Sequence, residues 1–167
     1  PLAHWHKQGQ PQGPWQVPII QPAIPMDSIP MDAEIALHIH VFYPELLAPI
    51  LQRLGCNKLR PDLFVTYSNA EIENSIKSVL AEMGWTAKLH TVPNRGRDIG
   101  PLLTELGLQL DRDYLIHGHL HTKKSVLIDG GLASRWREFL LMNLLGDARK
   151  PMLDRIASLL IRDSDLG

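Results

Sequence analysis

The chain has 167 residues, of which 44% are apolar and 21% are charged, and its formal net charge is -1. These values are typical of one soluble globular domain and exclude disordered and fibrous proteins. Lysine and arginine form no long run, which gives no indication of nucleic-acid binding, and the single Cys56 excludes an internal disulfide or a cysteine-based zinc cluster.

The N-terminal part of the chain is rich in proline. Seven of the 13 prolines lie within the first 30 residues. Their spacing prevents a helix, interrupts a strand ladder and favours extended polyproline II structure. We therefore expect residues 1–33 to form a linker or an arm across the domain, with a proline-rich recognition peptide as the alternative. Residues 34–167 are then the folded domain.

From residue 35 onward, short β-rich runs alternate with amphipathic helical runs. Strands are expected at 35–42, 63–67, 86–92 and from 114–117 onward, and helices at 44–54, 69–83, 98–110, 135–145 and 152–161. This order predicts an α/β fold, a doubly wound, mainly parallel, Rossmann-like sheet with helices on both faces and the strand order 3-2-1-4. The helical spacing of Trp136, Phe139, Leu140 and Leu144 predicts core positions rather than a platform for stacking sugars.

Unusual polar residues gather where the predicted strands end. His38 and His40 end the first strand, and polar runs follow the other strands at 66–69, 94–100 and 117–125. In a doubly wound sheet, ligands bind beyond these carboxyl ends. We therefore expect the binding site there, with His38 and His40 as pocket walls or, alternatively, as half-buried histidines hydrogen-bonded to backbone.

The turn at 94–100 has the composition of a phosphate-binding loop. Gly96 and Gly100 allow a close backbone approach or a positive φ, and the helix that follows directs its first N–H groups toward the crevice. Arg95 and Arg97 can bind phosphate oxygens in a bidentate way. Asp98 either caps the helix or holds a ligand hydroxyl or an arginine. The alternative is a charged turn with a structural cap.

The fourth strand carries histidines at alternate positions. His117, His119 and His121 would share one face, and three such histidines suggest zinc first. A closed zinc site needs a fourth ligand, however, and Lys123 and Lys124 next to it would repel a cation. We therefore expect no metal site. Two lysines beside imidazoles suit a diphosphate instead, and the alternative is a solvated basic turn.

These motifs together resemble the rhamnan synthesis protein F family. The resemblance rests on ALHIHVFY at 36–43, NRGRDIGP at 94–101, HLHTKKS at 119–125, WR at 136–137 and LLG at 144–146, and it covers roughly residues 35–167. It implies a glycosyltransferase that adds sugars, chiefly L-rhamnose from dTDP-L-rhamnose, during synthesis of bacterial surface polysaccharide or lipopolysaccharide. The implied partners are a nucleotide-sugar donor and a glycan or lipid-linked glycan acceptor.

A more distant likeness is to GT-A glycosyltransferases, in which a strand ending in Asp-x-Asp binds a metal that holds the diphosphate. Here Asn94-Arg-Gly96 has the place of their Asn-x-Gly turn, but the following strand ends in histidines and lysines at 119–124. If the likeness holds, these residues replace the charge of the metal. We therefore expect donor binding without a metal or other cofactor.

The resemblance and the polar runs together give a set of site residues. The expected base for the acceptor hydroxyl is Asp98, His119 or His121. The residues assigned to donor binding are His38, His40, Asn94, Arg95, Gly96, Arg97, Gly100, Lys123 and Lys124. The chain stops about where another strand would begin, so we expect the acceptor-binding half to be missing and the fragment to bind donor without turnover.

Two other classes of function fit the sequence. One is a non-catalytic module that binds glycans or a partner in a larger polysaccharide-assembly protein. The other is a metallohydrolase with a histidine site, which needs carboxylates near the histidines, and Asp98 is the clear candidate. No signal peptide is visible and no apolar run reaches the roughly 18 residues of a membrane span. We expect a cytoplasmic protein, with a peripheral position at the inner face of the membrane as the alternative.

Overall fold

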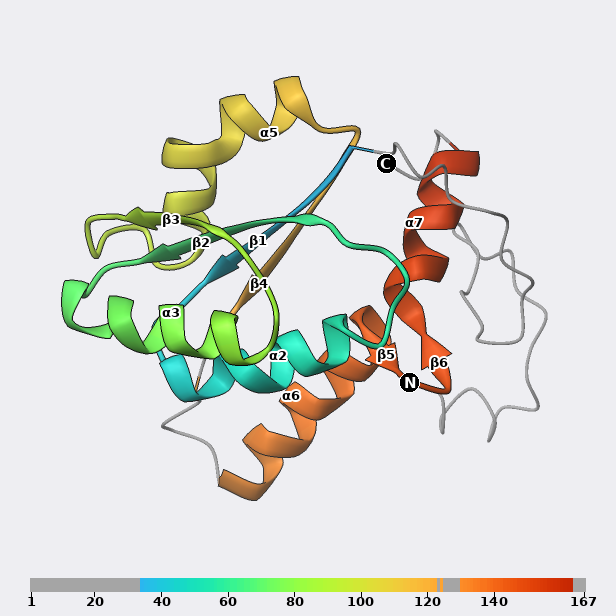
Figure 1. Ribbon diagram of the computed structural model, residues 1–167, viewed down its shortest axis with the longest axis horizontal. Helices are drawn as coiled ribbons and strands as arrows, with labels where there is room; N and C mark the ends of the chain where they lie inside the picture. Colours follow the sequence, from blue (N-terminus) through green and yellow to red (C-terminus); the bar gives the residue numbers. More distant parts are fainter. Residues whose placement is uncertain (1–33, 123, 125–129, 164–167) are drawn as a thin grey trace.

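A four-stranded parallel sheet forms the centre of the protein (Figure 1). The computed structural model describes residues 34–122, 124 and 130–163. The strands are β1 (Ile35–His40), β2 (Asp62–Tyr67), β3 (Lys88–Thr91) and β4 (Ile116–His121), and their order is β3-β2-β1-β4. Both the strand order and the doubly wound, Rossmann-like α/β fold predicted from the sequence are confirmed. The proposed arm at 1–33 lies outside the described residues.

Most helices begin and end close to the residues that the sequence indicated, but α6 begins at Gly130 and not at Arg135. They are η1 (Pro44–Leu46), α2 (Leu47–Leu54), η2 (Ala70–Ile72), α3 (Glu73–Glu82), α4 (Ile99–Pro101), the π-helical η3 (Leu102–Leu106), α5 (Gly107–Asp113), α6 (Gly130–Leu144) and α7 (Met152–Arg162). Asn69 caps η2, because its side chain accepts a hydrogen bond from the backbone N–H of Glu71. The short antiparallel pair β5 (Gly146–Asp147) and β6 (Lys150–Pro151) has no counterpart among the predicted elements.

The two faces of the sheet differ in polarity because successive side chains of a strand point to opposite faces. One face carries Leu37 and Ile39 of β1 and Val41 just after it, and forms the main core beneath α2, α3 and α6. The other face is apolar only near the beginnings of the strands, where Ala36 and Phe64 pack against η3 and α5. Figure 1 shows α5 on one side of the sheet and α2, α3 and α6 on the other. The ends of the strands on the α5 face are left for polar side chains.

Helix α6 turns a different side to the core from the one that the sequence predicted. Trp136 is 59% exposed, and Phe139, Leu140 and Leu144 are also exposed. Leu141 of this helix is buried, and so is Leu145, which directly follows the helix. The prediction of core positions for Trp136, Phe139, Leu140 and Leu144 is therefore wrong. Because α6 carries apolar residues on most of its circumference, periodicity could not identify the stripe that packs.

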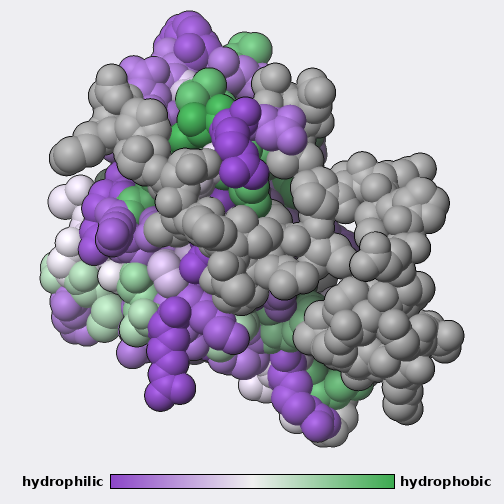
Figure 2. All heavy atoms as spheres, turned by 90° about the vertical axis from the view of Figure 1, so that its right-hand side faces the viewer, coloured by the Kyte–Doolittle hydropathy of each residue, from purple (hydrophilic) through white to green (hydrophobic). Residues whose placement is uncertain are grey.

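Helix α7 is tied to the rest of the domain by a buried carboxylate. Asp154 is 1% exposed and accepts hydrogen bonds from the backbone N–H groups of Lys58 and Leu59, both at 2.9 Å. Asn57 joins the same loop to the end of α6, because its side-chain N–H donates to the carbonyl of Leu145 at 3.0 Å. Figure 2 views the side of the molecule that carries α7 and shows hydrophilic side chains beside smaller hydrophobic areas. Within the described part of the chain, no helix has the length and apolar character needed to cross a membrane.

Candidate functional site

The register of the sheet brings polar side chains from all four strands to one face. His38 pairs with His119 across β1 and β4, and His40 pairs with His121. On the other side of β1, His40 pairs with Thr66 of β2. Residues paired in a parallel ladder point to the same face. These side chains therefore lie together on the α5 face, at the ends of the strands.

Three of these side chains form a buried hydrogen-bonded chain. The hydroxyl oxygen of Thr66 lies 2.8 Å from His38 Nε2 and 2.8 Å from His40 Nδ1. His38 Nδ1 in turn lies 2.9 Å from Nδ1 of His119. His38 is fully buried and His40 is 6% exposed. They therefore lie beneath the site and bond to a side chain, rather than forming open walls or bonding to backbone.

Asp98 closes the cluster from the loop that follows β3. Its Oδ2 atom lies 3.2 Å from His119 Nε2 and 2.9 Å from His121 Nδ1. The side chains of Asp98, His119 and His121 are 23%, 17% and 37% exposed, so this end of the cluster faces solvent. The structure thus brings together the three residues that the sequence nominated for catalysis. Asp98 makes no side-chain capping bond to α4, so the alternative of a structural cap is wrong.

The protons of this cluster can be arranged in two self-consistent ways, because a neutral imidazole carries one N–H and a hydroxyl donates once. In the first, His40 donates to Thr66 and Thr66 donates to His38. His38 Nδ1 then donates to His119, whose Nε2–H is left to donate to Asp98. In the second, all of the bonds from His40 to His119 reverse. A lone pair on His119 Nε2 then faces the Asp98 carboxylate.

Burial keeps the inner histidines neutral. Desolvation, together with the charges of His119 and His40, lowers the pKa of His38 from 6.5 to about 3. Desolvation also lowers the pKa of His40 and of His119. Burial raises the pKa of Asp98, but the hydrogen bond from His119 and the other nearby donors and charges outweigh it and leave the pKa below its usual value. At neutral pH, Asp98 is therefore an ionised carboxylate, and the imidazoles of His38, His40 and His119 are uncharged.

Two glycines give the Asp98 loop its tight path. Gly96 has a φ of 76°, and its carbonyl accepts a hydrogen bond from the N–H of Gly100 at 2.8 Å. A Cβ atom on Gly96 would lie 2.8 Å from Gly100 Cα, and one on Gly100 would lie 2.6 Å from the carbonyl oxygen of Arg95. Arg97 also has a positive φ, of 54°. The loop thus packs backbone against backbone, and this places Asp98 over the histidines.

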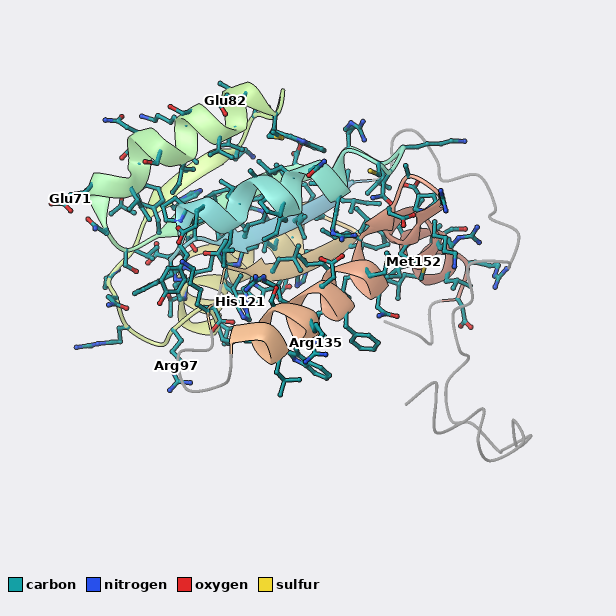
Figure 3. The ribbon with its side chains drawn as sticks, turned by 90° about the horizontal axis from the view of Figure 1, so that it is seen from below. Glu71, Glu82, Arg97, His121, Arg135 and Met152 are labelled. Carbon is teal, nitrogen blue, oxygen red and sulfur yellow. The ribbon has the colours of Figure 1, made fainter. Side chains whose placement is uncertain are left out.

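The cationic residues lie around the cluster rather than inside it. Asn94, Arg95 and Arg97 are exposed on the loop, and Figure 3 shows the Arg97 side chain extending outward, away from His121. Lys124 forms an ion pair with Glu45, and its Nζ lies 4.8 Å from the ring centroid of Tyr43. Lys123, also assigned to the diphosphate, lies outside the described residues.

Three residues of the site had no role in the sequence analysis. Thr66 links the two buried histidines, and it lies in a polar strand end that the sequence did mark. Thr122 holds the ends of β1 and β4 together, because its hydroxyl accepts the N–H groups of Phe42 and Tyr43 at 2.8 and 2.9 Å. His90 pairs with Thr66, and its buried Nε2 has no hydrogen-bond partner among the described residues. Combining the predicted strand order with the period of two could have placed His90 on this face.

Comparison with known families shows to which family the chain belongs. The sequence model of the family described as rhamnan synthesis protein F matches residues 4–167, so the chain belongs to this family. The match begins within the proline-rich segment and thus extends beyond the range of 35–167 that the motifs indicated. Membership implies a part in rhamnan synthesis. Comparison with curated proteins and with solved structures gave no significant match.

Replacing Gly96 by alanine is expected to lower the free energy of unfolding by more than replacing Gly84. Both residues have a positive φ, so each substitution introduces about 1–2 kcal/mol of backbone strain. Only at Gly96 does the added Cβ also collide with backbone, whereas nothing lies within 4 Å at Gly84. Urea unfolding of Gly96→Ala and Gly84→Ala measures the difference. Equal losses would contradict the close approach of the loop.

The free energy of unfolding is expected to fall as the pH is lowered from about 6.5 toward about 3. Folded His38 stays unprotonated over this range, whereas unfolded His38 takes up a proton, so acid favours the unfolded chain. His38→Gln should make this pH dependence shallower. Ile76→Val, a core change in α3, should lower stability by about 0.5–1.5 kcal/mol at every pH. Urea titrations between pH 7 and pH 4 test this, and an unchanged slope in His38→Gln would refute it.

Proposed function

We propose that this member of the rhamnan synthesis protein F family binds a nucleotide-sugar donor, dTDP-L-rhamnose, at the Asp98–His119–His121 cluster and serves as the donor-binding part of a glycosyltransferase. The observation that carries the proposal is the position of this cluster at the carboxyl ends of β1 and β4. In the order β3-β2-β1-β4, chain connections run to opposite sides of β1, which is where doubly wound sheets bind nucleotides.

The charges around the cluster suit a diphosphate. Arg95 and Arg97 are exposed on the loop that carries Asp98, and a guanidinium can bind phosphate oxygens through two parallel hydrogen bonds. Lys124 is paired with Glu45. A bound diphosphate would compete with the Glu45 carboxylate for this lysine. We therefore expect the two arginines to contribute more to donor affinity than Lys124 does.

The same cluster contains groups for the transfer reaction. As the acceptor oxygen forms its bond to the sugar, the bond to the diphosphate breaks, the acceptor hydroxyl loses a proton and the leaving group gains negative charge. Asp98, His119 and His121 are the exposed end of the cluster, so one of them is expected to receive the proton. His121 has the most exposed side chain of the three.

Calorimetric titration with dTDP-L-rhamnose, dTDP and UDP-sugars tests this proposal. Arg95→Ala is expected to weaken the binding of dTDP-L-rhamnose by about 10–100-fold, because a charge-assisted hydrogen bond contributes about 1.5–3 kcal/mol. The matched control is Arg112→Ala, which removes an exposed arginine of α5 that is paired with Asp113. It should leave the affinity unchanged.

Two results would overturn the proposal. One is equal donor affinity for Arg95→Ala and the unsubstituted chain, which would place the diphosphate elsewhere. The other is the binding of oligosaccharide with no nucleotide binding, which would identify a non-catalytic glycan-binding module of a larger assembly protein.

A further inference from the structure

The exposed end of the cluster has the composition of a metal site. Asp98, His119 and His121 each offer one ligand atom, and these atoms lie within 4.8 Å of one another. The carboxylate comes from the loop after β3 and the two imidazoles come from β4. We propose that these three residues bind a divalent transition-metal ion, with zinc as the ion that fits them best.

Both distances from the carboxylate to the imidazoles are close to those of tetrahedral coordination. Zinc binds imidazole nitrogen and carboxylate oxygen at about 2.0–2.2 Å, which places neighbouring ligand atoms about 3.3 Å apart. Asp98 Oδ2 lies 3.2 Å from His119 Nε2 and 2.9 Å from His121 Nδ1. The two imidazole nitrogens lie within 4.8 Å of each other, so small side-chain rotations would have to bring all three atoms to the spacing that the ion requires. Two imidazoles and one carboxylate favour a transition metal over magnesium or calcium, which prefer oxygen ligands.

The buried histidines behind the cluster supply the support that a metal-binding histidine usually has. Such a histidine donates its second ring N–H to a neighbouring acceptor. Here His119 Nδ1 can donate to His38 Nδ1, His38 Nε2 to Thr66, and the Thr66 hydroxyl to His40. This direction satisfies every bond in the chain and points the lone pair of His119 Nε2 at the Asp98 carboxylate. In this arrangement His119 Nε2 and Asp98 are both acceptors, so a cation between them satisfies both; in the reverse arrangement, His119 donates to Asp98 instead.

The surroundings leave a coordination position open. The three side chains are 17–37% exposed, so solvent or a ligand oxygen can reach the ion as the fourth ligand, as in catalytic zinc sites. The charge of Lys124, which from sequence argued against a cation, is balanced by Glu45. If the proposed function holds, the open position would take a phosphate oxygen of the donor, and the acceptor proton would then pass to solvent instead of to one of the three ligands. The sequence-based expectation of metal-independent donor binding would then be replaced.

Titration of the full, untagged chain with Co²⁺, followed by displacement with Zn²⁺, tests the inference without any sugar. Bound metal is first removed with a chelator, and His4 and His6 are replaced by alanine so that this second pair of histidines in the sequence cannot contribute. One ion per chain is expected, with visible absorption bands of Co²⁺ bound by nitrogen and oxygen. His121→Ala and Asp98→Ala should weaken binding more than about tenfold. His117→Ala, on the same face of β4 but outside the cluster, should bind like the parent.

The outcomes separate this inference from the proposed function. Absence of stoichiometric Co²⁺ binding, or equal Co²⁺ affinity in His121→Ala and His117→Ala, would overturn the metal site. The His121→Ala variant is expected to fold, because His121 lies at the exposed end of β4. Nucleotide titrations into chelated and metal-loaded protein complete the test. Metal binding without nucleotide binding would support the site and refute the donor proposal. Nucleotide binding without metal binding would support the donor proposal and refute the metal site.

Discussion

The parallel pairing of β1 with β4 is the constraint on which the rest of the site depends. It sets His38 beside His119 and His40 beside His121, all on the α5 face. A shift of one residue along either strand would turn that strand's histidines into the apolar core beneath α2 and α3. Burying imidazoles there without partners would cost several kcal/mol. The apolar face of the sheet therefore fixes the register, and the register in turn gathers the polar residues.

The loop after β3 completes the site, because it places the carboxylate of Asp98 against the histidines of β4. Because Gly96 and Gly100 pack backbone against backbone, the chain bends sharply enough for Asp98 to reach the histidines of β4. Beneath them, Thr66 and His38 hold the rings in place. The cluster thus has a rigid, buried base and an exposed end, which suits either a proton transfer or the coordination of an ion.

The sequence predicted the features that depend on the local preferences of individual residues, namely the boundaries of helices and turns and the strands of the sheet. Pro44, Asn69 and the glycine-rich turn mark element boundaries by their own conformational preferences, and the β-rich runs gave the sheet and its order. It could not predict the features that packing decides. Helix α6 is apolar around most of its surface, so the exposure of Trp136 depends on which stripe meets the sheet. Likewise Asp98 was equally compatible with a helix cap, and only the tertiary fold turns it toward His119.

The most direct test of the central claim is an NMR titration of the full chain with dTDP, observing histidine ring nitrogens and the indole N–H of Trp136. The central claim is that ligands bind this protein at the Asp98–His119–His121 cluster. It predicts that the ring signals of His119 and His121 shift on binding while the Trp136 signal, on the exposed apolar side of α6, stays in place. Shifts at Trp136 with unchanged histidine signals would contradict it.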